Sequence, residues 1–198
     1  MYALFNLPDF SEPLIKQFLL QGASIFNRAG FTHIRDMTSS LTQWKINLEF
    51  LERPDFLLHV EHWFVCEEVK NINSLIETIK NCKSQENPWM KIRGIKVFVD
   101  GSLGSNTACL SHHYTGLNHS GQMIFDGADF KNILREAWKN RLQVAAHAIG
   151  DEASHKVINW AREVYAEGIQ GYLHLEHAEI LRPETIQNMK SLHVRCHL

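Results

Sequence analysis

The sequence lacks the features that mark several common protein classes. Its 20 basic and 22 acidic residues leave a formal net charge of only −2, so the charge balance does not favour nucleic acid or an anionic membrane as a partner. No apolar run approaches the roughly 20 residues that cross a bilayer. Low-complexity tracts and short repeats are missing as well. We therefore expect a soluble globular protein with no nucleic-acid partner and no membrane partner.

Cysteine is scarce, and its spacing excludes two further classes. The four cysteines form no Cys-x-x-Cys pair, which argues against a zinc ribbon and against a disulfide scaffold; they are Cys66, Cys82, Cys109 and Cys196. The first ten residues have no basic start and are a poor match to a signal peptide. We expect reduced thiols and a cytoplasmic location.

The sequence does contain a regular alternation of strand and helix patterns. With 198 residues, 44% of them hydrophobic, the chain is long enough for a substantial core. Apolar spacing, capping residues and prolines predict the elements in chain order. The predicted helices cover 13–29, 39–53, 71–83, 129–141, 151–168 and a segment from about 183. The predicted strands cover 31–36, 56–66, the runs around Ile95, His147 and His177, and 192–197.

This alternation predicts an α/β fold with a parallel sheet covered by helices. Two architectures satisfy it, an open doubly wound sheet and a (β/α)8 barrel of the TIM type. No Gly-x-Gly-x-x-Gly follows a strand, and polar residues gather at the carboxyl ends of successive strands, so the barrel is favoured. A complete barrel needs eight strands and about 250 residues. We therefore predict an incomplete barrel of about six β/α units, forming one domain over residues 1–198.

Three apolar runs each contain a side chain that is able to bind metal. Lys96 lies in the run 94–101, His147 in the run 144–151, and His177 in the run 173–178. A lysine or histidine costs free energy inside a buried strand unless a partner compensates it. Three such runs in succession suggest a shared site.

The same runs carry a family resemblance. The stretch 94–108 (GIKVFVDGSLGSNTA), then 147–151 (HAIGD) and 176–178 (EHA) resemble the amidohydrolase superfamily in order and spacing. Within it they are most similar to amidohydrolase family 3, the YtcJ-like metal-dependent hydrolases. The segment 30–36 (GFTHIRD) resembles an early strand of that family. The resemblance covers most of the chain.

The resemblance implies a metal centre, usually zinc, with one or two ions. It places Lys96, His147 and His177 at metal-ligand positions, with Lys96 able to act only as a carbamate. It also implies hydrolysis of a C–N bond in an N-acyl or related amide, a small-molecule substrate, by metal-activated water. Residues expected to support the ligands or to lie in a substrate loop are Asp100, Ser102, Asp151 and Glu176.

Two features of the family pattern are missing from the sequence. We find neither the His-x-His that supplies two ligands nor the aspartate that acts as general base, so the catalytic residues stay unknown. We expect weak zinc binding by this chain, and self-association through open barrel edges. The alternative function is a truncated, non-catalytic regulatory or interaction protein, since some relatives are described as exoenzyme regulatory proteins. Whether the chain is an enzyme is left open.

Each candidate also has a purely structural interpretation. His147 suits a hydrogen-bonded core position, Lys96 a solvated strand end, and both Asp100 and Asp151 a capping role. Alternation along the last motif predicts that His177 shares a face with Leu173 and Leu175, which would turn Glu176 and His174 towards the helices. Histidines whose spacing indicates no site are His33, His155, His174, His193 and His197. Those expected to be solvated in the long loop are His112, His113 and His119.

Overall fold

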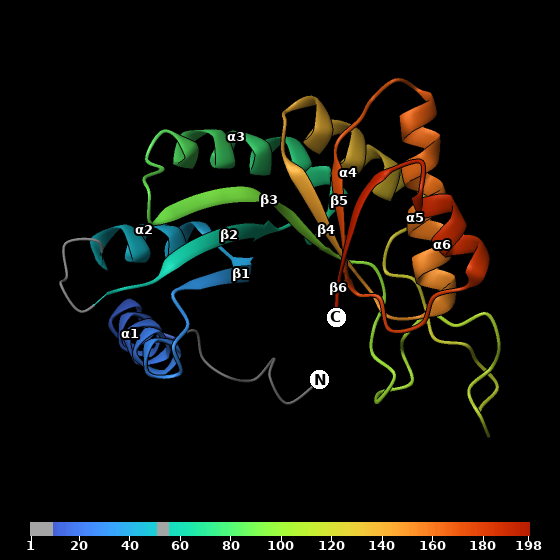
Figure 1. Cartoon of the computed structure of the whole chain (residues 1–198), viewed down its shortest axis with the longest axis horizontal. Coiled ribbons are helices and arrows are strands. Elements are labelled where there is room, and N and C mark those ends of the chain that lie inside the picture. The colour runs from blue at the N-terminus through green and yellow to red at the C-terminus, as the bar shows by residue number, and fades with distance from the viewer. Residues whose placement is uncertain (1–9, 51–55) are drawn as a thin grey trace.

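The computed structural model describes residues 10–50 and 56–198, and its centre is one parallel sheet of six strands. The strands follow one another in the order β1 to β6, and a helix lies between each consecutive pair (Figure 1). The strands are β1 (His33–Ser39), β2 (His59–Val65), β3 (Met90–Phe98), β4 (Gln143–Ala148), β5 (Tyr172–His177) and β6 (His193–His197). The helices are α1 (Glu12–Arg28), α2 (Leu41–Phe50), the 3-10 turn η2 (Val69–Asn71), α3 (Ile72–Lys83), α4 (Gly127–Lys139), α5 (Asp151–Ala166) and α6 (Pro183–Met189).

The predicted elements are confirmed, with boundaries that shift by a few residues. Local sequence explains several of the helix ends. A proline stands in the first turn of α1, and Gly30 follows that helix with φ of +85°, a conformation that glycine adopts at little cost. Helix α4 begins where the Asp126 side chain accepts a hydrogen bond from the Asp129 amide at 2.8 Å. Predictions for residues 51–53 and for the first nine residues lie outside the described part of the chain.

The sheet is strongly curled, as a partial barrel requires. The Arg35 guanidinium on β1 donates hydrogen bonds to both carboxylate oxygens of Glu176 on β5, at 2.8 and 3.2 Å. In a flat sheet these strands would lie about 19 Å apart, because adjacent strands are separated by about 4.8 Å. Trp63 on β2 and His174 on β5 also meet, with ring centroids 4.8 Å apart. The incomplete barrel is therefore confirmed, and these four side chains lie on its concave face.

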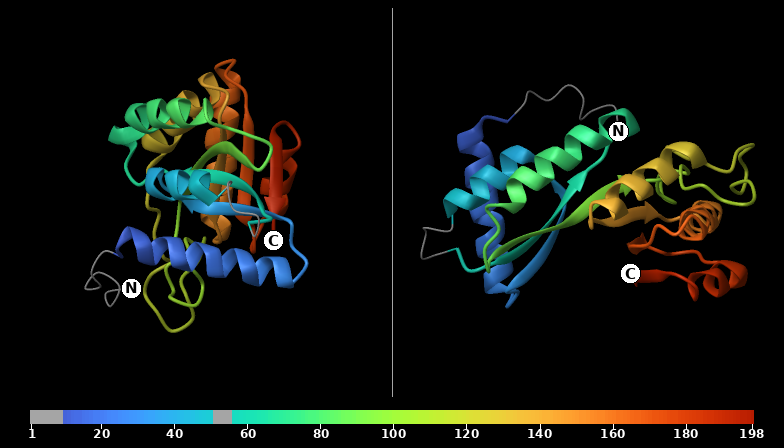
Figure 2. Two further views of the ribbon diagram at one scale, coloured as in Figure 1. Left: turned by 90° about the vertical axis from the view of Figure 1, so that its left-hand side faces the viewer. Right: turned by 90° about the horizontal axis from the view of Figure 1, so that it is seen from above.

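Helices cover the convex face of the sheet (Figures 1 and 2). Strand residues such as Val97, Ala146 and Leu175 pack there against apolar residues of α3, α4 and α5 in one large core cluster. A second, smaller cluster joins α1 and α2 to the same side of β1 and β2, through residues such as Ala23 and Val60. The helix side is mainly apolar but includes His62, whose ring meets Trp44 of α2, whereas His174 and Glu176 lie on the concave face.

The prediction of which side chains of the run 173–178 face the helices is wrong. Leu173 and Leu175 belong to the helix-side core, whereas His174 and Glu176 lie on the concave face beside partners from other strands. His177 nevertheless reaches the side of His147, because its backbone has φ of +74°. Simple alternation holds only for extended backbone, and a left-handed residue at the strand end breaks it.

The cysteines and the helices were the subject of two further expectations. All four cysteines are free in the structure, and three of them are buried. Among the described residues, no helix combines the length and the apolar character needed to cross a membrane.

Candidate metal centre

The candidate site lies on the concave face at the carboxyl ends of β3, β4 and β5. Strand register places Phe98, His147 and Glu176 side by side in one row, with Lys96, Ala145 and His174 in the row below. His177 follows directly after Glu176 at the end of β5. The parallel strands therefore bring Lys96, His147 and His177 together from three separate motifs.

His147 is held in a definite orientation. Its Nε2 donates to the Gly101 carbonyl oxygen at 2.9 Å, which leaves the lone pair on Nδ1. The rings of His147 and His177 meet edge to face, with centroids 4.5 Å apart. Burial lowers the pKa of His147, and the nearby His177 and Lys96 lower it further, while the bond to Gly101 opposes them. The imidazole is therefore neutral at physiological pH and able to bind a cation.

Lys96 is nearly inaccessible, with 3% of its surface exposed. Burial lowers the pKa of its ammonium group to about 8; the positive charge of Arg35 acts in the same direction and the Glu176 carboxylate opposes it. The Nζ atom lies 5.0 Å from the centre of the Phe98 ring. The solvated strand-end interpretation is therefore wrong, because the side chain is buried among these groups.

Asp100 connects the end of β3 to the end of β4. Its carboxylate accepts hydrogen bonds from the amides of Cys109 and Gly150, both at 2.9 Å, and of Ile149 at 3.1 Å. One of its oxygens also lies 3.7 Å from Nε2 of His147. Because Asp100 accepts hydrogen bonds from three buried backbone amides, it positions the loop that follows β3. That loop includes the Gly101 carbonyl that orients His147.

Ser102 and Asp151 make their side-chain hydrogen bonds to residues other than His147 and His177. Ser102 is exposed, and its hydrogen bonds stay within the loop, to Ser105 and Thr107. Asp151 lies in the first turn of α5 and accepts from the Ser111 amide at 2.9 Å and from Arg182 at 2.8 Å. Although burial opposes the shift, these bonds lower the pKa of Asp151 to about 2. Its contacts join α5 to the preceding loop and to the start of α6, but its side chain does not cap α5, whose N-cap residue is Gly150. Contact with substrate stays a prediction for both residues.

Beside the predicted ligands lies a group of residues of which the sequence indicated Glu176 but not His174 or His197. His174 is hydrogen-bonded to His197 of β6 at 2.8 Å and to the Gln143 side chain of β4 at 2.6 Å. Ligand atoms of His174, Glu176 and His197 all lie within 4.8 Å of one another. One signal was available: His174 and Glu176 are two residues apart on one strand and therefore share a face. His197 on β6 joins this group only through the register between β5 and β6.

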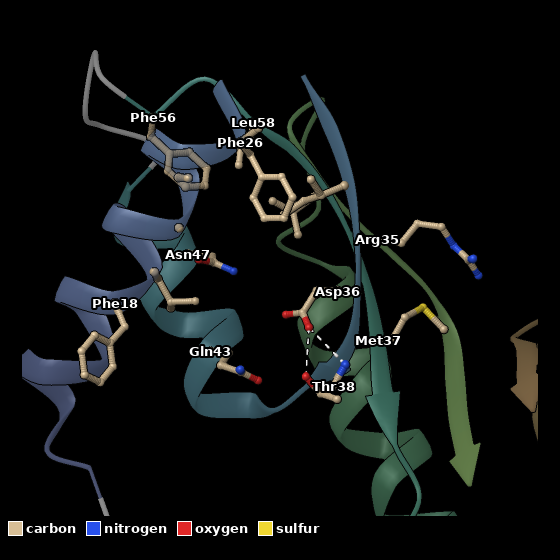
Figure 3. A pocket seen from close by; sticks show the side chains of 15 residues that line it. Phe18, Phe26, Arg35, Asp36, Met37, Thr38, Gln43, Asn47, Phe56 and Leu58 are labelled. Carbon is tan, nitrogen blue, oxygen red and sulfur yellow. Dashed lines mark hydrogen bonds between the residues drawn. The ribbon is translucent and has the colours of Figure 1, made fainter. Parts of the chain in front are cut away.

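An apolar cavity of about 440 Å³ lies on the other side of the sheet, between α1, α2 and β1 (Figure 3). In Figure 3, Asp36 and Asn47 point towards this space, whereas Arg35 and Met37 point away from it, on the opposite side of β1. The histidines of the concave face do not line it. The cavity is thus a feature of the helix layer and is separate from the candidate metal centre.

Comparison with known proteins agrees with this geometry. The model of the Amidohydrolase family matches residues 3–198, almost the whole chain. The chain belongs to the amidohydrolase family. Over 109 residues it is 35% identical to the Protein LONG AFTER FAR-RED 3 of Arabidopsis thaliana, a match that covers 54% of this chain and 19% of that protein. Over 101 residues it is 34% identical to a Bacillus subtilis (strain 168) protein whose name describes it as an amidohydrolase, YtcJ, covering 50% and 19%.

Solved structures resemble the chain over a greater length. An uncharacterised metal-dependent hydrolase from Pyrococcus furiosus superposes with a TM-score of 0.81 and 25% identity, covering 98% of this chain and 40% of that one. A second such hydrolase, from Pyrococcus horikoshii, gives a TM-score of 0.78 at 22% identity, covering 98% and 38%, which shows the shared fold. This amidohydrolase-family chain therefore spans less than half the length of these relatives.

The residues present fit a metal in part. A metal-binding imidazole characteristically donates its other N–H to a carbonyl or a carboxylate, and His147 does so to Gly101. His177 is exposed, and its ring lies against that of His147, with the ring centroids 4.5 Å apart. Lys96 fits the donor set only after its amine has been converted to a carbamate, because an ammonium group repels a cation. The described residues thus offer two imidazoles and one convertible lysine.

Proposed function

We propose that this chain supplies part of the active site of a metal-dependent amidohydrolase, which hydrolyses a C–N bond in an N-acyl or related amide. The observation that carries the proposal is the pairing of His147 with His177 above a buried Lys96, at the carboxyl ends of parallel strands. Barrel enzymes carry their chemistry at that end. Family membership supports the same reaction class.

His147 and His177 are the residues that would hold the metal. The hydrogen bond to Gly101 keeps the His147 lone pair on Nδ1, and Asp100 holds the loop that carries this carbonyl. When bound, a divalent metal such as zinc polarises a carbonyl group and lowers the pKa of water towards about 7. The protein's contribution is to orient the His147 imidazole and to place the His177 ring beside it before the metal arrives.

Lys96 is prepared for carbamate formation. Burial lowers the pKa of Lys96 to about 8, so the neutral amine is more populated near neutral pH than it is in a solvated lysine. The neutral amine adds to carbon dioxide, forming an N–C bond and releasing one proton, and the product is an anionic oxygen ligand. Burial therefore serves the site twice, because it provides the neutral amine and keeps water away from the carbamate.

The first experiment measures zinc and activity on the same preparations. The purified chain is loaded with Zn²⁺ and bicarbonate, its metal content is determined by plasma mass spectrometry, and hydrolysis of a panel of N-acyl amides is followed. We expect His147→Ala and Lys96→Met to lower the zinc content and to abolish any hydrolysis that the unmodified chain shows. His193→Ala, an exposed histidine on β6, is the matched control and should behave like the unmodified chain.

The outcomes separate the two candidate functions. Hydrolysis that disappears in the His147 and Lys96 variants supports the amidohydrolase site. A folded, zinc-loaded chain that hydrolyses none of the amides contradicts catalysis by this chain and favours the regulatory or interaction role. Hydrolysis that survives both substitutions would show that these residues are not the site.

A further inference from the structure

A second set of ligand-type side chains lies beside His147 on the concave face, with two members in the row of His147 and one in the row below. It consists of His174 and Glu176 on β5 and His197 on β6, which are placed side by side by the parallel register of these two strands. His174 and Glu176 are 4% and 8% exposed, and His197 is half-buried. Their ligand atoms lie within 4.8 Å of one another. Lys96, His147 and His177 are not members of this set.

Gln143 determines which nitrogen of His174 is available. Its amide oxygen faces Nε2 of His174 at 2.6 Å, so Nε2 carries the proton and donates it. The lone pair of His174 is therefore on Nδ1, which points at Nε2 of His197 at 2.8 Å. An outer partner that fixes the tautomer in this way is characteristic of imidazoles that bind metal.

The spacing needs only small adjustments to hold a cation. Ligand atoms around a tetrahedral zinc ion, with bonds of about 2.0–2.2 Å, lie about 3.3 Å from one another. The two imidazole nitrogens must separate by about 0.5 Å on that basis, and the carboxylate must move closer. His197 must also move its proton from Nε2 to Nδ1, a change of tautomer that releases no proton to solvent.

Positive charge surrounds the set: Arg35 pairs with Glu176, and Arg195 lies beside His174 in the strand register, so a divalent cation must compete with both. In the metal-free protein the Arg35 guanidinium donates hydrogen bonds to the two carboxylate oxygens of Glu176, at 2.8 and 3.2 Å. It neutralises a carboxylate that would otherwise be buried without a charged partner. A carboxylate oxygen has two lone pairs, so a metal is able to bind Glu176 while Arg35 retains one of its hydrogen bonds. His197 is the most accessible member and marks the side from which an ion enters.

We propose that His174, Glu176 and His197 form a second divalent-cation site, suited to Zn²⁺ and separate from the site of His147 and His177. Two histidines and one glutamate are an established zinc ligand set that leaves a fourth coordination position open. The proposal is independent of the amide hydrolysis proposed above, because it uses different residues and is tested by binding alone.

The test is calorimetric titration of the metal-free chain with Zn²⁺ at neutral pH. The starting variant is His147→Ala/His177→Ala, which removes both imidazoles of the first site. We expect this protein to bind one zinc ion per chain. In the same background, Gln143→Leu should weaken binding by roughly 10–100-fold, the usual effect of losing an outer partner. His197→Ala should weaken it more, because it removes a ligand, and His193→Ala should have no effect.

A second measurement avoids any loss of folding in the variants. Zinc is added to the unmodified chain labelled with ¹⁵N in its histidines, and the imidazole signals of His174 and His197 should shift while that of His193 does not. The proposal is overturned if the His147/His177 variant stays folded by circular dichroism but binds no zinc. It is equally overturned if His197→Ala leaves the affinity unchanged, or if the signals of His174 and His197 do not move.

Discussion

Arg35 on β1 and Glu176 on β5 are joined by two hydrogen bonds across the concave face, although three strands lie between them in the sheet. The pair therefore connects the first strand of the sheet to the fifth directly. Burial is the main reason that the pKa values of Lys96 and His174 are lowered; Arg35 lowers both further, whereas Glu176 raises both. A single ion pair thus joins two distant strands of the curled sheet.

We predict that Arg35→Gln destabilises the protein by about 1–3 kcal/mol, because it leaves the buried Glu176 carboxylate without its charged partner. The matched control is Arg93→Gln. Arg93 pairs with Glu61 at the surface, with side chains 45% and 32% exposed, and exposed pairs contribute only about 0–1 kcal/mol. Urea denaturation gives the free energy of unfolding of each variant. Equal losses in the two variants would show that the Arg35–Glu176 pair is not a special contact.

We predict that stability falls as the pH drops from about 6.5 to 4, in part because of His62. Burial lowers the pKa of His62 to about 4, although the Asp36 carboxylate 3.7 Å away opposes the shift. Since the unfolded chain takes up this proton first, the contribution of His62 is complete above pH 6.5 and is lost as the pH approaches 4. The loss amounts to at most about 3 kcal/mol.

The measurement is the free energy of unfolding as a function of pH, with chelator present. His62→Gln should flatten the profile between pH 6.5 and 4, whereas His193→Gln, at an exposed position, should leave it unchanged. A profile for His62→Gln that matches the unmodified chain would contradict the assignment of this pH dependence to His62.

We predict that Asp100→Asn loosens the loop that follows β3. The amide of asparagine offers a single oxygen acceptor, so at least one of the three backbone donors loses its partner, at a cost of about 1–3 kcal/mol. Hydrogen exchange at the Cys109, Ile149 and Gly150 amides should become faster. Asp126→Asn is the control, because asparagine caps a helix as well as aspartate does. Unchanged exchange in Asp100→Asn would contradict the positioning role.

We predict that the purified chain self-associates. Among residues 10–50 and 56–198, no strand pairs with the outer edge of β1 or of β6, and open edges are sites of strand pairing between chains. Sedimentation velocity over a range of concentrations, with reductant present because Cys196 is exposed, should show a rising mean mass. Cys196→Lys places a charge on β6 and should reduce the association. A monomer at every concentration would contradict the prediction.

Much of the architecture was predictable because it depends on local patterns. Apolar spacing and capping residues were sufficient for the helices and strands, and the position of Lys96 and His147 inside apolar runs marked them as candidates. Lys96 is buried and His147 is hydrogen-bonded to Gly101, and their roles as metal ligands stay predictions. What failed was the facing of His174 and Glu176, because the prediction assumed extended backbone through His177.

The amino-acid sequence by itself determined the order of the β/α units, the parallel sheet and the family. These depend on side-chain periodicity and on short motifs, which act between near neighbours in the chain. The tertiary structure alone decided that Arg35 meets Glu176 and that His174 meets His197. Those contacts join residues 141 and 23 positions apart, and they depend on sheet curvature and strand register. Register and curvature arise from packing the whole helix layer against the sheet, so no local pattern encodes them.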